Sequence, residues 1–454
     1  MAPVRETVVA LLLALAGPAC GGSAPAPAAP THANAAPTIA AKLTFIEDDY
    51  ARALAEARAK KVPLFVDAWA TWCHTCLSMR EFVFPAPEMR SRGAGFVWLS
   101  IDTEKTENAE FVRTHPMEAW PTLWVIDPAT EAPALKWNGA ATAAELGELL
   151  DDAKAAMTRG DGGGDAGAAY MRGNKEVAAG RMDDAIASYR AALAAAPASW
   201  PKRAHVVEAL SARLVAKKDW AGDVDLAAAE LGKLPPGTSA KSVAYDALRS
   251  VTQLPEGAAA RRDAVITATR ELADALGGKV LADDRSDLYD QLVDVLGELG
   301  RVDEKKSVAR AWATMLEAEA AKGTTPAARA VFDAHRFNAY MALGEPERAV
   351  PMLQASERDF PGDYNPPARL AATYFATKRN DDALAAIDRC LAKSYGPRKL
   401  RHYTLKADIQ KAKGDTAGEK ATLEQALAHA KGLALTGSIV RVRDALEARL
   451  KKLS

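Results

Sequence analysis

A short segment that recurs along the C-terminal part of the chain limits the possible folds more than any other feature. The segment Gly180–Ile186 (GRMDDAI) returns as Lys378–Leu384 (KRNDDAL), and looser copies begin at Lys218, Gly300, Gly344 and Gly414. The copies that begin at residues 344, 378 and 414 are 34 and 36 residues apart. Such a period is typical of helical hairpins that bury their apolar faces only against neighbouring hairpins. The pattern therefore predicts a stacked helical array that forms a groove.

These copies resemble the tetratricopeptide repeat (TPR), which has a period of about 34 residues. Its small-residue, turn, aromatic and proline positions are matched by Gly173, Gly180, Ala185, Tyr189, Ala192 and Pro197. Residues 370–391 and 407–427 match two further hairpins, whereas 204–330 is more degenerate and predicts antiparallel helix pairs with longer loops. The resemblance implies a surface that recruits protein partners.

The preceding region has a different pattern, in which apolar runs of strand length alternate with helical spacing. Buried strands are predicted at 62–69 and 96–102, and two shorter strands at 122–127 and 134–137. Helices are predicted at 45–61, 77–83 (interrupted by Pro85 and Pro87), 107–114 and 142–157. The glycine-rich run at 160–165 then predicts a flexible hinge between two domains.

The strongest chemical signal is Trp72-Cys73-His74-Thr75-Cys76, which follows a predicted strand and opens a predicted helix. Two cysteines with this spacing can form a disulfide while the first stays on the leading turn. Free N–H groups and the positive end of the helix dipole favour the thiolate form of Cys73. Cys73 is thus the predicted nucleophile, and Cys76 is placed to attack the mixed disulfide and release the partner.

This region resembles the thioredoxin family over about residues 45–157, since Val66–Cys73 closely follows that family's strand into its active site. The resemblance implies that Asp67 is a buried carboxylate that helps to deprotonate Cys76. It also implies that Trp120-Pro121-Thr122 is a cis-proline loop that, with Trp72, binds the substrate strand. Within the family, Leu77–Phe84 with Pro87-Glu88 is similar to the C-terminal domain of the DsbD thiol:disulfide interchange proteins.

Two positions depart from the family pattern. Trp98 stands where many thioredoxins carry a lysine near the buried carboxylate, which puts the proton relay in doubt. His74-Thr75 replaces the usual Gly-Pro pair. A histidine there can donate to the Cys73 thiolate or pair with it, which would make the disulfide more oxidising.

The N-terminus has the layout of an export signal. Arg5 precedes the apolar run Val8–Ala16, and small residues follow it before Cys20. We expect a signal peptide at 1–20 whose Cys20 becomes lipidated, as in bacterial lipoproteins, or alternatively a cut after Ala16 that frees a soluble protein. Ala- and Pro-rich residues 21–42 predict a disordered linker. These features predict a location in the periplasm or cell envelope, with an anchor at Cys20.

The predicted fold is therefore an α/β thioredoxin-like domain at 43–158, with a central mixed sheet and flanking helices. A hinge at 159–167 and an all-α TPR-like solenoid at 168–454 follow it. Lys and Arg total 58 against 59 for Asp and Glu, and this balance argues against a nucleic-acid-coating protein. Nine apolar residues are also too few to span a membrane.

The predicted function is that of an exported protein-disulfide reductase or isomerase. It needs no cofactor beyond the Cys73–Cys76 disulfide and no metal, acts on client proteins with thiols or disulfides, and is recharged by a redox partner. Three alternatives stay open: a non-enzymatic TPR scaffold with an inert thioredoxin-like domain, a purely structural disulfide, and a copper or zinc site that joins Cys73 and Cys76 to a histidine such as His115. Cys390, at a small-residue position of a repeat, is predicted to be a buried filler.

Overall fold

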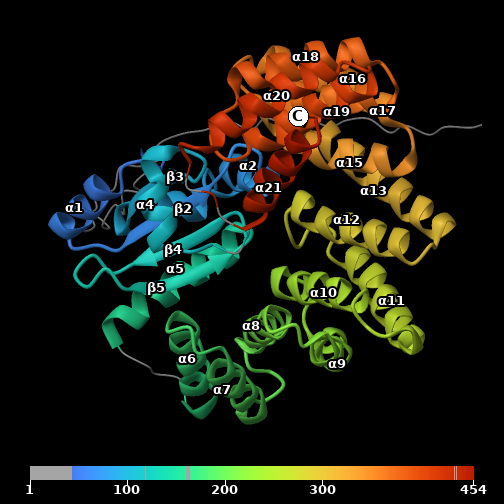
Figure 1. The fold of residues 1–454 in the computed structure, drawn as a ribbon. Helices are drawn as coiled ribbons and strands as arrows, with labels where there is room; N and C mark the ends of the chain where they lie inside the picture. The colour runs from blue at the N-terminus through green and yellow to red at the C-terminus, as the bar shows by residue number, and fades with distance from the viewer. Residues whose placement is uncertain (1–42, 118, 160–163, 434, 436, 454) are drawn as a thin grey trace, which may run out of the picture. The chain divides into compact units, whose positions relative to one another are not determined.

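The computed structural model describes residues 43–453 except 118, 160–163, 434 and 436. The predicted signal peptide, the linker at 21–42 and Cys20 lie outside these residues. In the described part, the chain first forms a sheet with helices on both faces and then a long series of helices (Figure 1). No helix in that part has the length and apolar character needed to cross a lipid bilayer.

The sheet contains five strands in the order β1-β3-β2-β4-β5. Strands β1 (Phe45–Glu47) and β2 (Leu64–Trp69) run parallel to β3 (Val97–Asp102), whereas β4 (Thr122–Ile126) is antiparallel to β2 and to β5 (Pro133–Asn138). The central strand β2 is buried on both sides, and its residues are apolar except for Asp67. This is the predicted α/β domain with a mixed sheet.

Side chains alternate between the two faces of the sheet, and each face packs on different helices. One face packs on α1 (Tyr50–Lys60) and α4 (Ala109–Thr114). The other packs on α3 (Pro87–Ser91), on α5 (Ala143–Arg159) and on a π-helical turn, η1 (Met79–Val83), that continues α2 (His74–Ser78). The second face therefore carries the helix that starts at the cysteine pair.

Three local predictions need correction. Residues 45–47 form a strand rather than helix, and helix α1 starts only after Asp49, whose side chain accepts the N–H of Arg52. Pro87 begins α3 instead of only ending a helix, because a proline at the first helical position loses no hydrogen bond. Helix α6 begins at Gly164, so the last four residues of the predicted hinge at 159–167 are helical.

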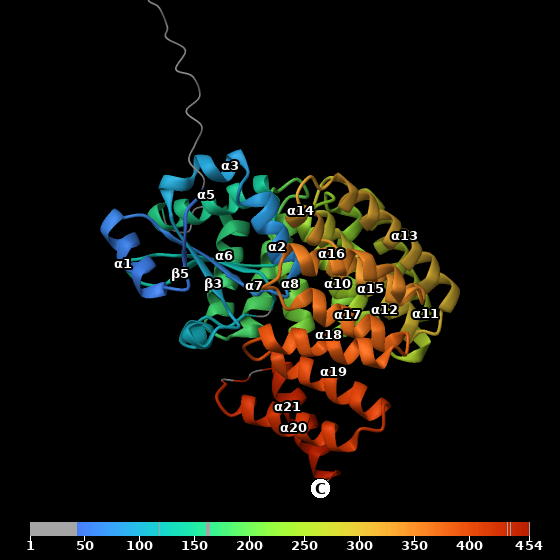
Figure 2. The same ribbon diagram turned by 90° about the horizontal axis from the view of Figure 1, so that it is seen from above.

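The remaining helices form the predicted TPR-like solenoid, in which each packs on its neighbours in the chain (Figures 1 and 2). They are α6 (Gly164–Ala178), α7 (Met182–Ala195), α8 (Arg203–Ala216), α9 (Trp220–Glu230), α10 (Thr238–Val251), α11 (Ala259–Ala275), α12 (Ala282–Glu298), α13 (Val302–Lys322), α14 (Pro326–Ala330), α15 (Asp333–Leu343), α16 (Val350–Asp359), α17 (Asn365–Ala376), α18 (Asn380–Lys393), α19 (Lys399–Ala412), α20 (Thr416–Ala430) and α21 (Gly437–Lys451). Cys390 is fully buried in the core of this array, as predicted.

The structure explains why the repeated segment recurs in the sequence. Its first residue follows a helix in every copy and has a positive φ, with values of 73° at Gly180, 60° at Lys218, 69° at Gly300, 76° at Gly344, 61° at Lys378 and 74° at Gly414. Glycine adopts this left-handed conformation without steric cost, and ends helices for that reason. The repeat pattern therefore records the turn between the two helices of each hairpin.

Replacing Gly173 by alanine tests the packing of the first hairpin. A Cβ at this buried position of α6 would lie 2.4 Å from Cε1 of Tyr189, whose hydroxyl is held by a 2.8 Å hydrogen bond to Asn174. We expect Gly173→Ala to lower the free energy of unfolding by about 1–2 kcal/mol, because overpacking exceeds the gain in helix propensity. Gly167→Ala, in the same helix with open space around it, should instead be neutral or stabilising in chemical denaturation. Equal effects of the two substitutions would contradict this packing argument.

Candidate active site

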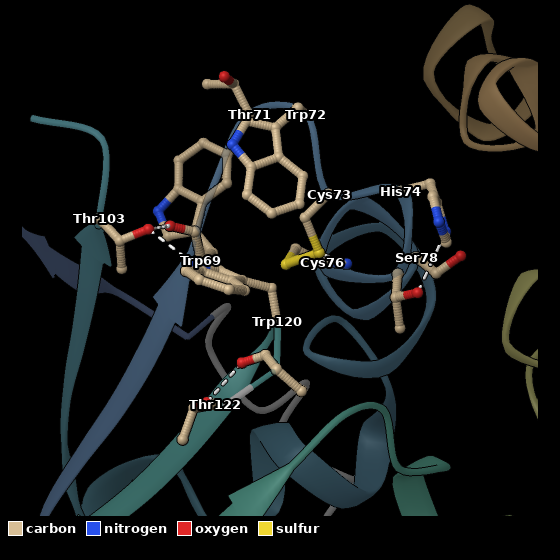
Figure 3. Close-up of a disulfide and its surroundings, with 12 residues drawn as sticks. Trp69, Thr71, Trp72, Cys73, His74, Cys76, Ser78, Thr103, Trp120 and Thr122 are labelled. Carbon is tan, nitrogen blue, oxygen red and sulfur yellow. Dashed lines mark hydrogen bonds between the residues drawn. A yellow bond between two sulfur atoms is a disulfide. The ribbon is translucent and has the colours of Figure 1, made fainter. Parts of the chain in front are cut away.

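The cysteine pair lies where β2 gives way to α2 (Figure 3). Cys73 is the N-cap residue of α2, and its Sγ accepts a hydrogen bond of 3.0 Å from the backbone N–H of Cys76. The two sulfurs form a disulfide. Cys73 is 4% exposed and Cys76 is fully buried. The arrangement fits an outer sulfur that a partner reaches first and an inner sulfur that it does not reach.

The loop of Trp120, Pro121 and Thr122 lies beside the disulfide. The Trp120–Pro121 peptide bond is cis, as the resemblance implies. The ring of Trp120 lies 5.3 Å from the ring of Trp72, and both pack on the apolar cluster that contains the two cysteines. Thr122 pairs with Ala68 of β2 and donates to the carbonyl of Ala119 at 2.7 Å. The structure thus brings together the residues predicted to bind substrate with those predicted to react.

Asp67 is buried in the central strand, on the sheet face that carries α2 and η1. It is 1% exposed, and neither carboxylate oxygen has a hydrogen-bond partner among the described residues. Burial raises its pKa to about 7, although the positive charge of Arg80 opposes that rise. A carboxyl group with this pKa can exchange a proton near neutral pH, which is what the predicted role requires.

Arg80 is a charged residue near this carboxyl that the sequence analysis missed. Its guanidinium lies 4.0 Å from the ring centre of Trp69, and one nitrogen lies 3.4 Å from Glu47. Trp98, at the position of the family's lysine, instead packs in the core and donates to the carbonyl of Gly93. The sequence offered one sign of this position, which is that Arg80 follows Cys76 by four residues, in the π-helical turn that continues α2.

Beside the disulfide, His74 contacts Asp283 and Thr75 rather than the Cys73 sulfur, and its role in tuning Cys73 stays a prediction. Its Nδ1 lies 3.4 Å from Oδ2 of Asp283 in α12 and 3.1 Å from the hydroxyl of Thr75. Figure 3 shows the ring on the side of the helix turned away from the disulfide. Burial alone would lower the pKa of His74, but the hydrogen bond to Asp283 and the charge of Asp287 raise it above its usual value. A carboxylate is thus the partner that holds this imidazole.

Residues of the solenoid also hold the turn before Cys73. Thr71 donates to the hydroxyl of Tyr364 at 2.7 Å, and its carbonyl accepts from the amide of Asn365 at 3.0 Å. The guanidinium of Arg398 lies 4.5 Å from the ring centre of Trp72. The solenoid therefore contacts the redox turn, and no local sequence pattern signals contacts between residues so far apart in the chain.

A further link runs through Glu104, which lies just after β3. One of its carboxylate oxygens accepts from the indole of Trp72 at 3.0 Å, and the other accepts from the backbone N–H of Arg398 at 2.8 Å. Burial raises the pKa of Glu104, although these two hydrogen bonds oppose the rise. Glu104 thus joins the turn before Cys73 to the loop that precedes α19.

His115, the histidine named for a possible metal site with the cysteines, lies elsewhere. Its ring stacks on Phe111 at 4.3 Å and meets the edge of Trp124 at 5.4 Å. Its pKa is lowered by burial. These contacts place the half-buried His115 beside α4, and it forms no group of metal ligands with Cys73 and Cys76 among the described residues.

Comparison with known proteins identifies the first domain. The family model described as "Thioredoxin-like" matches residues 45–128. The chloroplastic thioredoxin-like protein CITRX of Arabidopsis thaliana is 31% identical over 94 residues, which are 20% of this chain and 49% of that protein. The tomato (Solanum lycopersicum) CITRX is 28% identical over 94 residues, which are 20% of this chain and 51% of that protein. The chain thus spans about half the length of the curated relatives it matches.

Two solved structures are similar to the helical region. A tetratricopeptide repeat protein of Parabacteroides merdae is 13% identical with a TM-score of 0.40, and covers 63% of this chain and 100% of its own. A thermophilic TPR protein of Thermus thermophilus is 18% identical with a TM-score of 0.28, and the match covers 45% of this chain and 96% of that protein. The helical hairpins and the turns with positive φ define this region as a TPR-like solenoid. The chain is a thioredoxin-like domain fused to an all-helical TPR-like solenoid.

Proposed function

We propose that this protein is a thiol-disulfide oxidoreductase that reduces or isomerises disulfide bonds of client proteins. The observation that carries the proposal is the Cys73–Cys76 pair at the start of α2, where the N–H of Cys76 points at the Cys73 sulfur. In the reduced protein this N–H and the helix dipole stabilise a thiolate at Cys73. A thiolate that can attack a client disulfide is the chemical requirement for disulfide exchange.

The reaction balances as a two-electron exchange. The Cys73 thiolate attacks one sulfur of a client disulfide, an S–S bond forms between them, and the other client sulfur leaves as a thiolate. Cys76 then loses its proton and attacks the Cys73 sulfur, which breaks the mixed disulfide and releases the second client thiolate. The client gains two electrons, and the Cys73–Cys76 disulfide is re-reduced by a separate dithiol partner.

The position of His74 supports reductase or isomerase activity over oxidation. A protonated imidazole next to the Cys73 thiolate would stabilise the reduced form and make the disulfide a stronger oxidant. Here the imidazole of His74 contacts the carboxylate of Asp283 instead of the Cys73 sulfur. We therefore expect a reduction potential nearer that of thioredoxin, about −270 mV, than the value of about −120 mV found for strong oxidants.

The solenoid gives the protein a second role, the recruitment of client proteins through its surface. One observation favours the alternative of a scaffold with an inert redox domain: Cys73 is only 4% exposed, and the turn before it is hydrogen-bonded to Tyr364 and Asn365. Under that alternative the protein functions only by binding partner proteins through the solenoid, and the cysteines are dispensable.

Export belongs to the same proposal. The apolar run Val8–Ala16 after Arg5, with small residues before Cys20, supports a lipoprotein signal. Lipidation at Cys20 would hold the protein at the cell envelope, where disulfides form in client proteins. Metabolic labelling with a fatty acid should mark the wild type and not Cys20→Ser.

Insulin reduction and a redox titration test the proposed activity. The wild type with dithiothreitol should accelerate insulin precipitation, and the Cys73→Ser, Cys76→Ser double variant should fall to the rate without enzyme. Cys390→Ser, which removes a buried free thiol, is the matched control and should keep full activity. Titration against glutathione then gives the potential of the pair. A wild type that reduces no disulfide would favour the scaffold.

A further inference from the structure

Three side chains from three helices meet beside the redox turn and have no part in the exchange reaction. They are His74 of α2, Asp283 of α12 and His335 of α15, and one nitrogen or oxygen of each lies within 4.8 Å of the others. The ring centres of the two histidines are 3.7 Å apart, and Nδ1 of His74 is 3.4 Å from Oδ2 of Asp283. The group therefore joins the first domain to the solenoid.

His335 is the residue that points to a missing ligand. It is 1% exposed, and neither ring nitrogen has a hydrogen-bond partner among the described residues. Its nearest carboxylate is that of Asp287, at 3.8 Å from Nε2, which is too long for a hydrogen bond. Burying an imidazole without partners costs free energy that one bound cation would recover.

The carboxylate of Asp283 is fixed in a manner that suits a metal ligand. Its side chain is fully buried, and Ser78 of α2 donates a hydrogen bond to Oδ1. Oδ2 is the oxygen that faces His74. A hydrogen bond to the outer oxygen of a ligating carboxylate orients the inner one toward the metal.

The charges around the group are mainly negative. Asp283 belongs to the group itself, and three further aspartates of α12 lie near it: Asp284, Asp287 and Asp290. Against them stand two cations. Lys241 is 2.6 Å from Asp284 and 3.3 Å from Asp287, and the positive charge of the half-buried Arg369 opposes protonation of both histidines. The excess of carboxylates favours a divalent cation over an empty site.

We propose that His74, Asp283 and His335 bind a zinc ion that clamps the redox turn to the solenoid. Two imidazoles and one carboxylate are a common zinc ligand set, and they leave a fourth position for Asp287 or water. Because His74 is adjacent to Cys73, occupancy of the site fixes the start of α2. The alternative occupant of this space is a proton shared by His74 and Asp283, with His335 unpaired.

Binding is best measured on the oxidised protein, in which the Cys73–Cys76 disulfide offers no thiolate to metal. Chelator-treated protein should bind one equivalent of Zn²⁺ by calorimetry, and Co²⁺ should give visible bands of a low-symmetry site. We expect His74→Gln and His335→Gln to weaken binding about 100-fold or more, since even outer-shell changes cost 10–100-fold. His402→Gln is the matched control, because His402 is also buried in the solenoid with an unpartnered Nδ1.

The outcome does not depend on the proposed exchange activity, because the Cys73→Ser, Cys76→Ser double variant should bind Zn²⁺ as the wild type does. His74 is 27% exposed, so His74→Gln should fold and decides the matter if His335→Gln does not. Absence of binding, or binding that both histidine variants retain, would overturn the zinc site and leave the shared proton as the correct description.

Discussion

Replacing Cys76 by serine is expected to leave the protein covalently joined to its clients. Cys73 still attacks a client disulfide, but no second thiol is present to break the mixed disulfide that results. Cleavage of the mixed disulfide then depends on thiols of other molecules, and the time it takes should lengthen from seconds to about minutes or hours. Non-reducing electrophoresis should show high-mass species that disappear on reduction, and mass spectrometry should place the bond at Cys73.

Cys73→Ser is the matched variant and should trap almost nothing. Its remaining thiol, Cys76, is fully buried behind the turn and cannot meet a client sulfur. Cys390 is also buried, and burial raises its pKa to about 12, so it stays protonated and unreactive. Trapping in equal amounts by Cys73→Ser and Cys76→Ser would show that the proposed roles of the two sulfurs are wrong.

The parts of the site that sequence could predict are those set by local structure. The strand at Leu64–Trp69, the turn and the helix from His74 follow from a run that is apolar except for Asp67 and from a change of period, and they fix the place of Cys73. The turns between the helices of the solenoid could also be predicted, because they too are set by local structure. The left-handed conformation that follows a helix favours glycine at one position of each turn, and Gly180 and Gly344 occupy that position.

The parts that could not be predicted depend on contacts between distant segments. The orientation of His74 is decided by Asp283, some two hundred residues later in the chain. Tyr364 and Arg398 approach the redox turn from loops whose composition carries no sign of that contact. A motif determines which side chain stands at a position, whereas its partner depends on tertiary packing.

Strand β1 was not predicted, for a different reason. Its three residues, Phe45–Glu47, are too few to show an alternating pattern, and the helical spacing of α1 directly follows them. The strand forms because the edge of β3 offers backbone partners in parallel register. Short edge strands are set by their neighbours rather than by their own sequence.

Asp67→Asn should change how the stability of the protein depends on pH. In the folded protein the pKa of Asp67 is about 7, against 3.8 for an unperturbed carboxyl group. As pH rises above 4, the unfolded chain loses this proton first, so folding becomes less favourable until pH 7 and then stays constant. A shift of about three units at 1.4 kcal/mol each corresponds to about 4 kcal/mol. Asparagine at position 67 does not ionise, so the Asp67→Asn variant does not lose this unfolding free energy as pH rises.

We therefore expect the difference in unfolding free energy between Asp67→Asn and wild type to grow by up to about 4 kcal/mol from pH 4 to pH 8, as measured by urea denaturation. Glu148→Gln, an exposed carboxyl group on α5, is the control and should show no such growth. If Asp67 also takes the proton of Cys76, release of the mixed disulfide at pH 7 should slow by about 100-fold in the variant. A stability gap that does not change with pH would mean that folding does not raise the pKa of Asp67, and Asp67 would then be too weak a base to take the Cys76 proton efficiently near neutral pH.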